Sequence, residues 1–207
     1  MEYSVADNKV NFLIGKNGSG KTTLLDIFLG LIHTKQATRS YDIGNDYIYI
    51  NQMIPLLGSL ECREIVQLVL GLKYEKSSLT IHDLEADVDE FTIKIIKEFW
   101  DIKYNHLSGG QKKLFQQVLF IQFDKSVYLL DEPTNFLDRE NVHELFRVIN
   151  AKKNKTFIIV THDYRDLEIV DDYYVTIIDK GSIKGRFDKE EFETPETSSQ
   201  FLKYFKG

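Results

Sequence analysis

A glycine-rich segment between two differently patterned segments constrains the fold of this chain more than any other feature. The sequence Gly-Lys-Asn-Gly-Ser-Gly-Lys-Thr at residues 15–22 follows a largely apolar run at Val10–Ile14 and opens a pattern at Lys21–Ile32 with apolar residues three and four positions apart. The first pattern is typical of a buried strand and the second of an amphipathic helix. A strand, a tight loop and a helix in this order favour an α/β fold.

Short apolar runs recur along the chain and extend this prediction. They lie at Tyr47–Ile50, Val127–Leu130, Phe157–Val160 and Tyr173–Ile178. Helical patterns, such as the one at Glu140–Ile149, separate several of them. Because strands that alternate with helices form parallel sheets through right-handed crossovers, we predict a mostly parallel sheet. The Lys180-Gly181 pair after the last run predicts a turn into a short partner strand.

Residues 56–110 interrupt this alternation. They contain helical patterns at Leu60–Leu70 and Glu85–Trp100, joined by a polar connector at Lys73–Asp83, and no convincing strand. We therefore predict one domain over residues 1–207, with an α/β core at 1–55 and 111–207 and an inserted helical subdomain at 56–110. The length of 207 residues agrees with a single domain of this kind.

Composition narrows the class of protein. A charged fraction of 28% and a hydrophobic fraction of 43% are ordinary for a globular domain, and the net charge of −6 gives no electrostatic footprint for nucleic acid. The single cysteine, Cys62, excludes an intrachain disulfide and favours a reducing compartment. No run approaches the roughly 20 apolar residues that span a bilayer, and the N-terminus lacks a secretory pattern. We expect a cytoplasmic protein without direct nucleic-acid contacts.

The glycine-rich segment has the residue types that bind phosphate. Glycines allow successive backbone N–H groups to surround phosphate oxygens, and the following helix directs its positive end at the anion. In this pattern Lys21 reaches the terminal phosphates and the Thr22 hydroxyl ligates Mg²⁺. The alternative, a strand–helix turn without a ligand, is disfavoured by the strand before it and the helix after it. The predicted phosphate-binding residues are Gly15, Lys16, Asn17, Gly18, Ser19, Gly20, Lys21, Thr22 and Thr23.

Two adjacent carboxylates form a second candidate site. Asp131 and Glu132 follow the apolar run Val127–Leu130, so they lie at the carboxyl end of a predicted strand, where α/β sheets bind their ligands. One carboxylate can hold hydrated Mg²⁺ while the next orients water. Such a strand end is common by itself, and it becomes informative because the chain also has a phosphate-binding loop.

At residues 107–111 the chain reads Leu-Ser-Gly-Gly-Gln, which resembles the signature motif of ATP-binding cassette (ABC) ATPases. Other segments resemble further motifs of that family in the family's order, and the resemblance covers nearly the whole chain, from Tyr3 to about Phe187. Gln52 resembles the Q-loop glutamine, Asp-Glu-Pro-Thr at 131–134 the Walker B end, Asn-Phe-Leu-Asp at 135–138 the D-loop, and Thr-His-Asp at 161–163 the H-loop. The resemblance implies a P-loop NTPase core of ABC type that uses ATP and Mg²⁺.

The resemblance also implies roles for individual residues. Glu132 would be the general base, and His162 would contact the γ-phosphate. Thr22, Gln52 and Asp131 would hold Mg²⁺, with Lys21 neutralising phosphate charge. Ser108 is a suitable N-cap for a helix from about Gly109 to Phe123. The residues expected to contact ATP bound by another subunit are Ser108, Gly109, Gly110, Gln111 and Asp138.

One phosphate-binding loop and one signature motif per chain imply a second nucleotide-binding subunit, in a head-to-tail dimer around two ATP molecules. The leading hypothesis is the ATP-hydrolysing subunit of an ABC transporter, bound at the inner face of the cell membrane through a separate permease. An apolar patch at Met53–Leu57 would receive a permease helix. The alternative is a soluble ABC ATPase that acts on the ribosome or nucleic acid, because Asp-Glu-Pro-Thr-Asn-x-Leu-Asp is common in such members.

Two departures from the family pattern are visible. Tyr3 is too close to the phosphate-binding loop to be the family's adenine-stacking aromatic residue, which predicts weak discrimination between ATP and GTP. After the signature motif the family continues with basic residues and then small ones, whereas this chain continues with Lys112-Lys113 and then with bulky residues in place of the small ones, up to Phe120. We therefore expect this helix to pack differently from those of its relatives.

Overall fold

The computed structural model describes residues 3–33, 44–51 and 58–204, and it divides into two compact units. The first, here called the α/β unit, comprises residues 1–51, 125–133 and 153–207, and the second, the helical unit, comprises residues 52–124 and 134–152. The division drawn from the sequence placed residues 111–124 and 134–152 in the α/β core, whereas their contacts group them with the helical unit. Gln52 and the patch at Met53–Leu57 lie outside the described residues.

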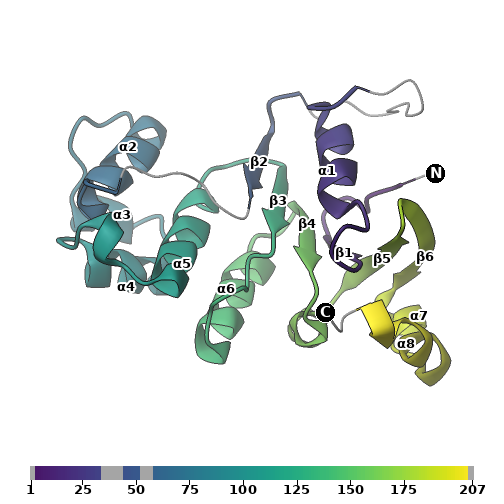
Figure 1. Ribbon diagram of the computed structural model, residues 1–207. Coiled ribbons are helices and arrows are strands. Elements are labelled where there is room, and N and C mark those ends of the chain that lie inside the picture. Colours follow the sequence, from purple (N-terminus) through teal and green to yellow (C-terminus); the bar gives the residue numbers. More distant parts are fainter. Residues whose placement is uncertain (1–2, 34–43, 52–57, 205–207) are drawn as a thin grey trace. The chain divides into compact units, whose positions relative to one another are not determined.

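The α/β unit is built on one six-stranded sheet with the order β2-β3-β4-β1-β5-β6 (Figure 1). The strands are β1 Val10–Ile14, β2 Tyr47–Ile50, β3 Val127–Asp131, β4 Thr156–Thr161, β5 Tyr173–Asp179 and β6 Ser182–Asp188. All neighbours from β2 to β5 pair in parallel, and β6 pairs antiparallel with β5. The predicted α/β class with a mostly parallel sheet is confirmed.

Helix α1, Lys21–Leu29, covers part of this sheet. Its buried side chains Leu24 and Leu25 belong to one apolar cluster with sheet residues such as Leu13 and Val160. The helix ends earlier than the predicted Ile32, because Gly30 takes a left-handed conformation with φ of 77°.

The end of the chain also packs onto the α/β unit. Its short helices are η2 Tyr164–Ile169, α7 Lys189–Phe192, α8 Pro195–Phe201 and η3 Leu202–Tyr204. The ring of Phe201 lies 5.2 Å from that of Phe187 on β6, and Tyr204 stacks beside Phe201. These aromatic contacts anchor the final helices to the edge hairpin.

The predicted turn at Lys180-Gly181 is confirmed. Both residues have positive φ, 48° and 69°, as a tight two-residue hairpin turn requires. The Gly181 N–H donates to the Ser19 carbonyl oxygen at 2.9 Å. The hairpin turn therefore supports the glycine-rich loop, although the two are distant in the sequence.

The helical unit contains α2 Cys62–Tyr74, α3 Ile81–Glu85, α4 Glu90–Phe99, η1 Tyr104–His106, α5 Gly109–Phe120 and α6 Arg139–Ala151. The single helix predicted at Glu85–Trp100 is wrong, because the segment forms the end of α3 and a separate α4. The Asp89 carboxylate accepts a hydrogen bond from the Thr92 N–H at 2.9 Å and starts the new helix there. None of the described helices has the length and apolar character needed to cross a membrane.

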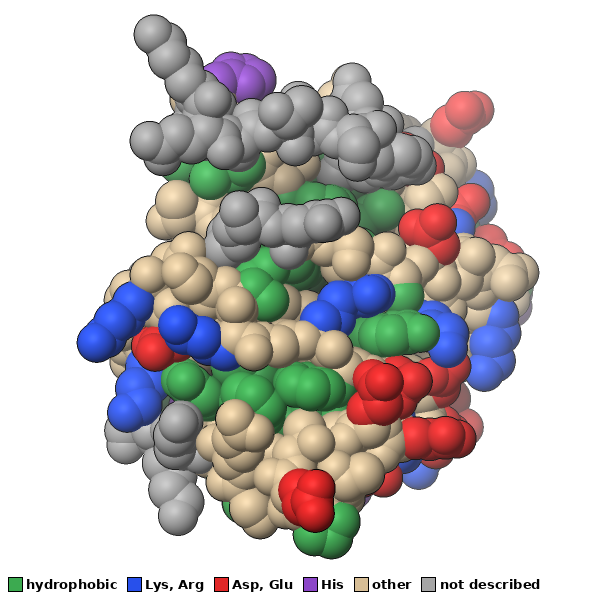
Figure 2. All heavy atoms as spheres, turned by 90° about the vertical axis from the view of Figure 1, so that its right-hand side faces the viewer, with side chains coloured by type: hydrophobic (Ala, Val, Ile, Leu, Met, Phe, Trp, Pro, Cys, Tyr) green, Lys and Arg blue, Asp and Glu red, His purple; other side chains and the backbone are tan. Residues whose placement is uncertain are grey.

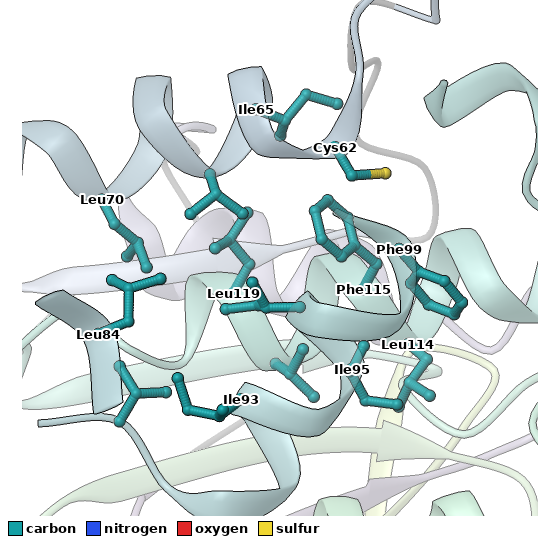
Figure 3. Close-up of a cluster of buried hydrophobic side chains, with 14 of the residues drawn as sticks. Cys62, Ile65, Leu70, Leu84, Ile93, Ile95, Phe99, Leu114, Phe115 and Leu119 are labelled. Atoms are coloured by element: carbon teal, nitrogen blue, oxygen red, sulfur yellow. The ribbon is translucent and has the colours of Figure 1, made fainter. Parts of the chain in front are cut away.

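The bulky residues after the signature motif fill the core of the helical unit (Figure 3). Leu114, Phe115, Val118 and Leu119 are all buried on one face of α5. The Phe115 ring lies 6.3 Å from that of Phe99 on α4. These side chains supply the apolar contacts that hold α5 to α2 and α4.

Candidate active site

The glycine-rich loop joins β1 to α1 and shows why glycine is required there. Gly18 and Gly20 have φ of 75° and 100°, which side chains with a Cβ rarely adopt. A Cβ at Gly15 would collide with the Ile178 carbonyl oxygen. Gly20 is the N-cap of α1, and no side chain caps that helix end. The first turn of α1 thus keeps its N–H groups available for an anion.

Lys21, the first residue of α1, is 8% exposed. Its ammonium group donates to the carbonyl oxygens of Gly15 at 2.7 Å and Lys16 at 3.2 Å. Desolvation lowers the pKa of Lys21, and the nearby Glu132 and Asp131 carboxylates partly offset this effect. The loop therefore holds a buried cation that interacts with both predicted carboxylates.

Ser19 supplies a test of whether the loop fits a phosphate ligand. Its hydroxyl oxygen is buried and has no hydrogen-bond partner among the described residues. An unpartnered buried hydroxyl is unfavourable by about 1–3 kcal/mol, so the loop has a polar atom that a ligand would satisfy. Gly18 has open space where a Cβ would stand. These features fit a bound phosphate group.

Asp131 and Glu132 lie at the carboxyl end of β3, both buried. The Glu132 N–H donates to the Val160 carbonyl oxygen of β4 at 2.9 Å. Glu132 has φ of 51°, a left-handed conformation that costs about 1–2 kcal/mol for a residue with a side chain. Such local strain is typical of functional sites.

The Glu132 side chain meets His162, which follows β4. Glu132 Oε2 lies 2.7 Å from His162 Nδ1. Burial raises the pKa of Glu132 above its ordinary value, and the charges of His162 and Lys21 oppose this rise. A carboxylate with a raised pKa is a stronger base than an ordinary glutamate, as a general base in catalysis should be.

The structure thus brings together the predicted residues of the α/β unit. Lys21, Asp131, Glu132 and His162 meet where β1, β3 and β4 end. Thr22 and Thr23 lie exposed in the first turn of α1, and Lys16 and Asn17 are exposed on the loop. The remaining described histidines, at positions 33, 82, 106 and 143, are exposed and lie outside this group.

The signature residues form a capping box at the start of α5. The Ser108 hydroxyl accepts from the Gln111 N–H at 3.3 Å, and the Gln111 side-chain oxygen accepts from the Ser108 N–H at 2.9 Å. The predicted N-cap at Ser108 is confirmed, and the helix ends at Phe120 rather than Phe123. This arrangement gives the N–H groups of Ser108 and Gln111 partners from the same segment of chain.

The D-loop residues lie against the signature residues within the helical unit. A Cβ at Gly110 would collide with the Phe136 carbonyl oxygen. Asp138 caps α6 by accepting from the Asn141 N–H at 2.9 Å. Residues of both motifs, including Ser108, Gln111 and Asp138, line a cleft of about 380 Å³. The Phe136 side chain is 85% exposed, and its φ is 68°.

Sequence reasoning missed two supports of this site. One is the Gly181 contact to the loop, and the other is a buried hydrogen bond between Thr161 and Asp166 that flanks His162. A threonine that ends a strand immediately before a candidate active-site histidine is a signal for the second. The first has no signal in the local sequence, because its partners meet only through the sheet.

Comparison with known proteins agrees with this geometry. The family model described as ABC transporter matches residues 1–135. The chain is 27% identical over 207 aligned residues to the energy-coupling factor transporter ATP-binding protein EcfA2 of Mycoplasmoides gallisepticum, covering 88% of this chain and 64% of that protein. It is 30% identical to the phosphate import ATP-binding protein PstB of Pyrobaculum aerophilum, covering 88% of this chain and 81% of that protein.

Solved structures show the same fold. A structure described as the ATP binding subunit of an ABC transporter superposes with a TM-score of 0.72 at 20% identity, over 97% of this chain and 85% of that one. The family model covers more than half of the chain. The chain belongs to the ABC transporter family of ATP-binding proteins.

Proposed function

We propose that this chain is the ATP-binding and ATP-hydrolysing subunit of an ABC transporter, with a permease as a separate chain. The observation that carries the proposal is the 2.7 Å contact between Glu132 and His162, in a group that also contains buried Lys21. A buried base, a histidine that orients it and a glycine-rich phosphate loop are the parts that phosphoryl transfer to water requires.

The residues present suit ATP and Mg²⁺. Residues 15–23 would surround the phosphates, with Lys21 against the terminal ones. Thr22, Gln52 and Asp131 offer the hydroxyl, amide and carboxylate oxygens that Mg²⁺ prefers. When bound, the ion neutralises charge that develops on the phosphate oxygens.

Glu132 would take the proton of the attacking water. Its Oε2 is engaged by His162 Nδ1, which leaves the other carboxylate oxygen for the water. The same contact leaves His162 Nε2 facing away from Glu132, and when the ring carries both protons Nε2 would donate to the γ-phosphate. Burial raises the pKa of Glu132 and with it the affinity for the proton, while the Lys21 ammonium favours the charged form that accepts the proton.

Two chains would complete two sites. The signature residues Ser108, Gly109, Gly110 and Gln111, with Asp138, would contact ATP held by the loop of another subunit. The chain has one loop and one signature motif, so a head-to-tail dimer around two ATP molecules satisfies both. The names of the relatives, ATP-binding proteins of transporters, support a permease partner and a place at the inner face of the cell membrane.

The alternative, action on the ribosome or nucleic acid, has less support. On the face that Figure 2 shows, some Lys and Arg side chains gather at one edge, and hydrophobic and other side chains lie between these and the remaining ones. The described residues of that face therefore form no continuous basic stripe of the kind that follows a phosphate backbone.

The variant Glu132→Gln tests the catalytic assignment. We expect kcat for ATP hydrolysis to fall by about 100- to 10,000-fold, because the general base is lost, while the Kd for ATP stays within a few-fold. Glu168→Gln, at an exposed position of the same unit, is the control and should hydrolyse ATP normally. Near-normal turnover by Glu132→Gln would refute the role of Glu132.

Purification of the tagged full chain from detergent-solubilised cells tests the partner. Recovery with a membrane protein of several spans is expected. Recovery with ribosomes or RNA instead would favour the alternative function.

A further inference from the structure

The loop that carries His162 is closed by a buried hydrogen-bonded group. The Thr161 hydroxyl donates to Asp166 Oδ2 at 2.7 Å and accepts from the Asp163 N–H at 3.0 Å. We call Thr161, Asp163 and Asp166 the Thr161 cluster. Thr161 is 1% exposed and Asp166 is fully buried. A buried carboxylate is costly unless it is well hydrogen-bonded, so this one needs a structural explanation.

The direction of these hydrogen bonds is fixed by chemistry. A hydroxyl has one proton to donate and two lone pairs, so the Thr161 hydroxyl donates to Asp166 Oδ2 while a lone pair accepts from the Asp163 N–H. The Asp166 N–H also donates to the Asp163 carbonyl oxygen at 3.2 Å. Hydrogen bonds therefore link residue 161 to residue 166 and link both of these residues to residue 163.

His162 lies inside this closed segment. Its backbone is bounded by Thr161 and Asp163, while its ring leaves the segment to meet Glu132 at 2.7 Å. The His162 side chain is 45% exposed, so packing alone does not fix its position. The cluster constrains the backbone on both sides of the histidine instead.

We propose that Thr161 and Asp166 are positioning residues for ATP hydrolysis, which hold His162 at hydrogen-bond distance from Glu132. This inference rests on the proposed function for its kinetic consequence. Without the cluster, the segment has more conformations and His162 meets Glu132 for a smaller fraction of the time. Misplacement of a catalytic group by about 1 Å can lower a rate by about 100-fold.

The helical unit offers a matched control. The Thr80 hydroxyl donates to Asp83 Oδ2 at 2.7 Å and accepts from the Asp83 N–H at 3.3 Å, the same pattern without a neighbouring active-site residue. Thr80→Val removes the same kind of hydrogen bonds as Thr161→Val. It should leave turnover unchanged.

The first measurement is steady-state ATP hydrolysis by the full chain. Thr161→Val should lower kcat by about 10- to 100-fold with the Kd for ATP within about twofold, and Thr161→Ser, which keeps the hydroxyl, should stay within about threefold of the unmodified chain. Equal impairment of Thr161→Ser and Thr161→Val, or normal kcat in both, would overturn the proposal.

The second measurement does not depend on hydrolysis. In ¹⁵N spectra of histidine-labelled protein, the Nδ1 signal of His162 should report its hydrogen bond to Glu132, with Glu132→Gln as the reference for an altered acceptor. Thr161→Val should shift that signal and Thr80→Val should not. An unchanged His162 signal in Thr161→Val refutes the positioning role, even if the chain proves not to hydrolyse ATP.

If Thr161→Val does not fold, a double variant tests the proposal in its place. Thr161→Val with Asp166→Leu replaces both partners by apolar groups, which avoids leaving a buried carboxylate unpaired. It should fold, as judged by its thermal transition, and show the same kcat loss and His162 signal shift. Normal values for both would overturn the proposal.

Discussion

The N-termini of two helices, α1 in the α/β unit and α5 in the helical unit, differ in how their free backbone N–H groups are capped. Each helix begins with N–H groups that lack partners within the helix. At α5 the Ser108 hydroxyl accepts from one of them, the Gln111 N–H, and the Gln111 side chain accepts from the Ser108 N–H. At α1 the N-cap is Gly20, and no side chain caps the helix.

Other helices of the helical unit are capped by their own side chains, as α5 is. Thr80, Asp89 and Asp138 each accept a hydrogen bond at the start of α3, α4 and α6. The start of α1 instead lies beside the buried Lys21 and the unpartnered Ser19 hydroxyl. At its helix start the α/β unit thus leaves polar groups without partners in the described part of the chain where a ligand is expected, whereas these helices of the helical unit are capped by their own side chains.

The largest expected effect comes from removing the cation at the open helix start. Lys21→Ala should raise the Kd for ATP by about 10- to 100-fold, because charge-assisted hydrogen bonds contribute about 1.5–3 kcal/mol each. Isothermal titration calorimetry measures this. The matched change in the first turns of α5, Lys112→Ala, removes a half-buried lysine whose ammonium donates to the Asn105 carbonyl oxygen at 3.3 Å, and it should leave ATP binding nearly unchanged. Equal losses in both variants would contradict the comparison.

The two units should also differ in their response to acid. Burial raises the pKa of Glu132, so its carboxylate takes up a proton as pH falls through a value above the ordinary 4.5. Below that raised pKa, kcat for ATP hydrolysis should fall by about tenfold per pH unit, since only the carboxylate form acts as a base.

In the helical unit, by contrast, the pKa of a carboxyl group at a helix start is lowered. Hydrogen bonds from Lys76 and Thr80 lower the pKa of Asp83, so the start of α3 should keep its ionised cap through the same range. A pH profile of kcat together with circular dichroism separates the two effects. A kcat that stays constant down to pH 4.5 would contradict the raised pKa of Glu132.

The helical unit also contains a buried side-chain amide without hydrogen-bond partners within the residues that the structure describes. Gln117 on α5 is fully buried, and neither of its side-chain amide atoms has a hydrogen-bond partner among the described residues. Gln117→Leu should therefore raise the free energy of unfolding by about 1–3 kcal/mol, measured by urea denaturation. The neighbouring Gln116 donates to the Tyr104 hydroxyl at 2.7 Å, so Gln116→Leu should lower stability. A lower free energy of unfolding in Gln117→Leu would contradict the prediction, because it would mean that the Gln117 amide makes a stabilising hydrogen bond.

The smallest expected effect is at the capped helix start. Ser108→Ala removes the capping hydroxyl and should lower the free energy of unfolding by about 1 kcal/mol, while Ser108→Asp, a good N-cap, should retain most of it. Thermal denaturation without nucleotide measures the difference. No loss in Ser108→Ala would show that Gln111 alone satisfies this helix end.

The strands and the loop could be predicted from the sequence because their signals are local. Val10–Ile14 and Tyr47–Ile50 carry apolar runs that end where the strands end, and the Lys180-Gly181 turn follows from two residues. The break between α3 and α4 was missed, because apolar spacing continues across it and only the cap at Asp89 marks it.

The residues of the site could be predicted from the sequence, but the contacts that hold them in place could not. The motifs identify Lys21, Glu132 and His162, and the fold brings these together. The contact from Gly181 to Ser19 and the burial of Asp166 depend on how distant segments pack. The grouping of α5 and α6 with the helical unit has the same origin, since a sequence pattern does not say which neighbour a buried helix face meets.

The position of β1 in the sheet has a consequence for the synthesis of the protein. Val10 pairs with Phe157 of β4 on one side and with Tyr173 of β5 on the other, so this strand is translated long before either neighbour. Until then its apolar side chains have no sheet to enter, and such delayed long-range pairing slows folding and exposes chains to aggregation. A nascent chain that stops before β5 would carry the complete glycine-rich loop and signature motif and still lack the strand that completes the pairing of β1.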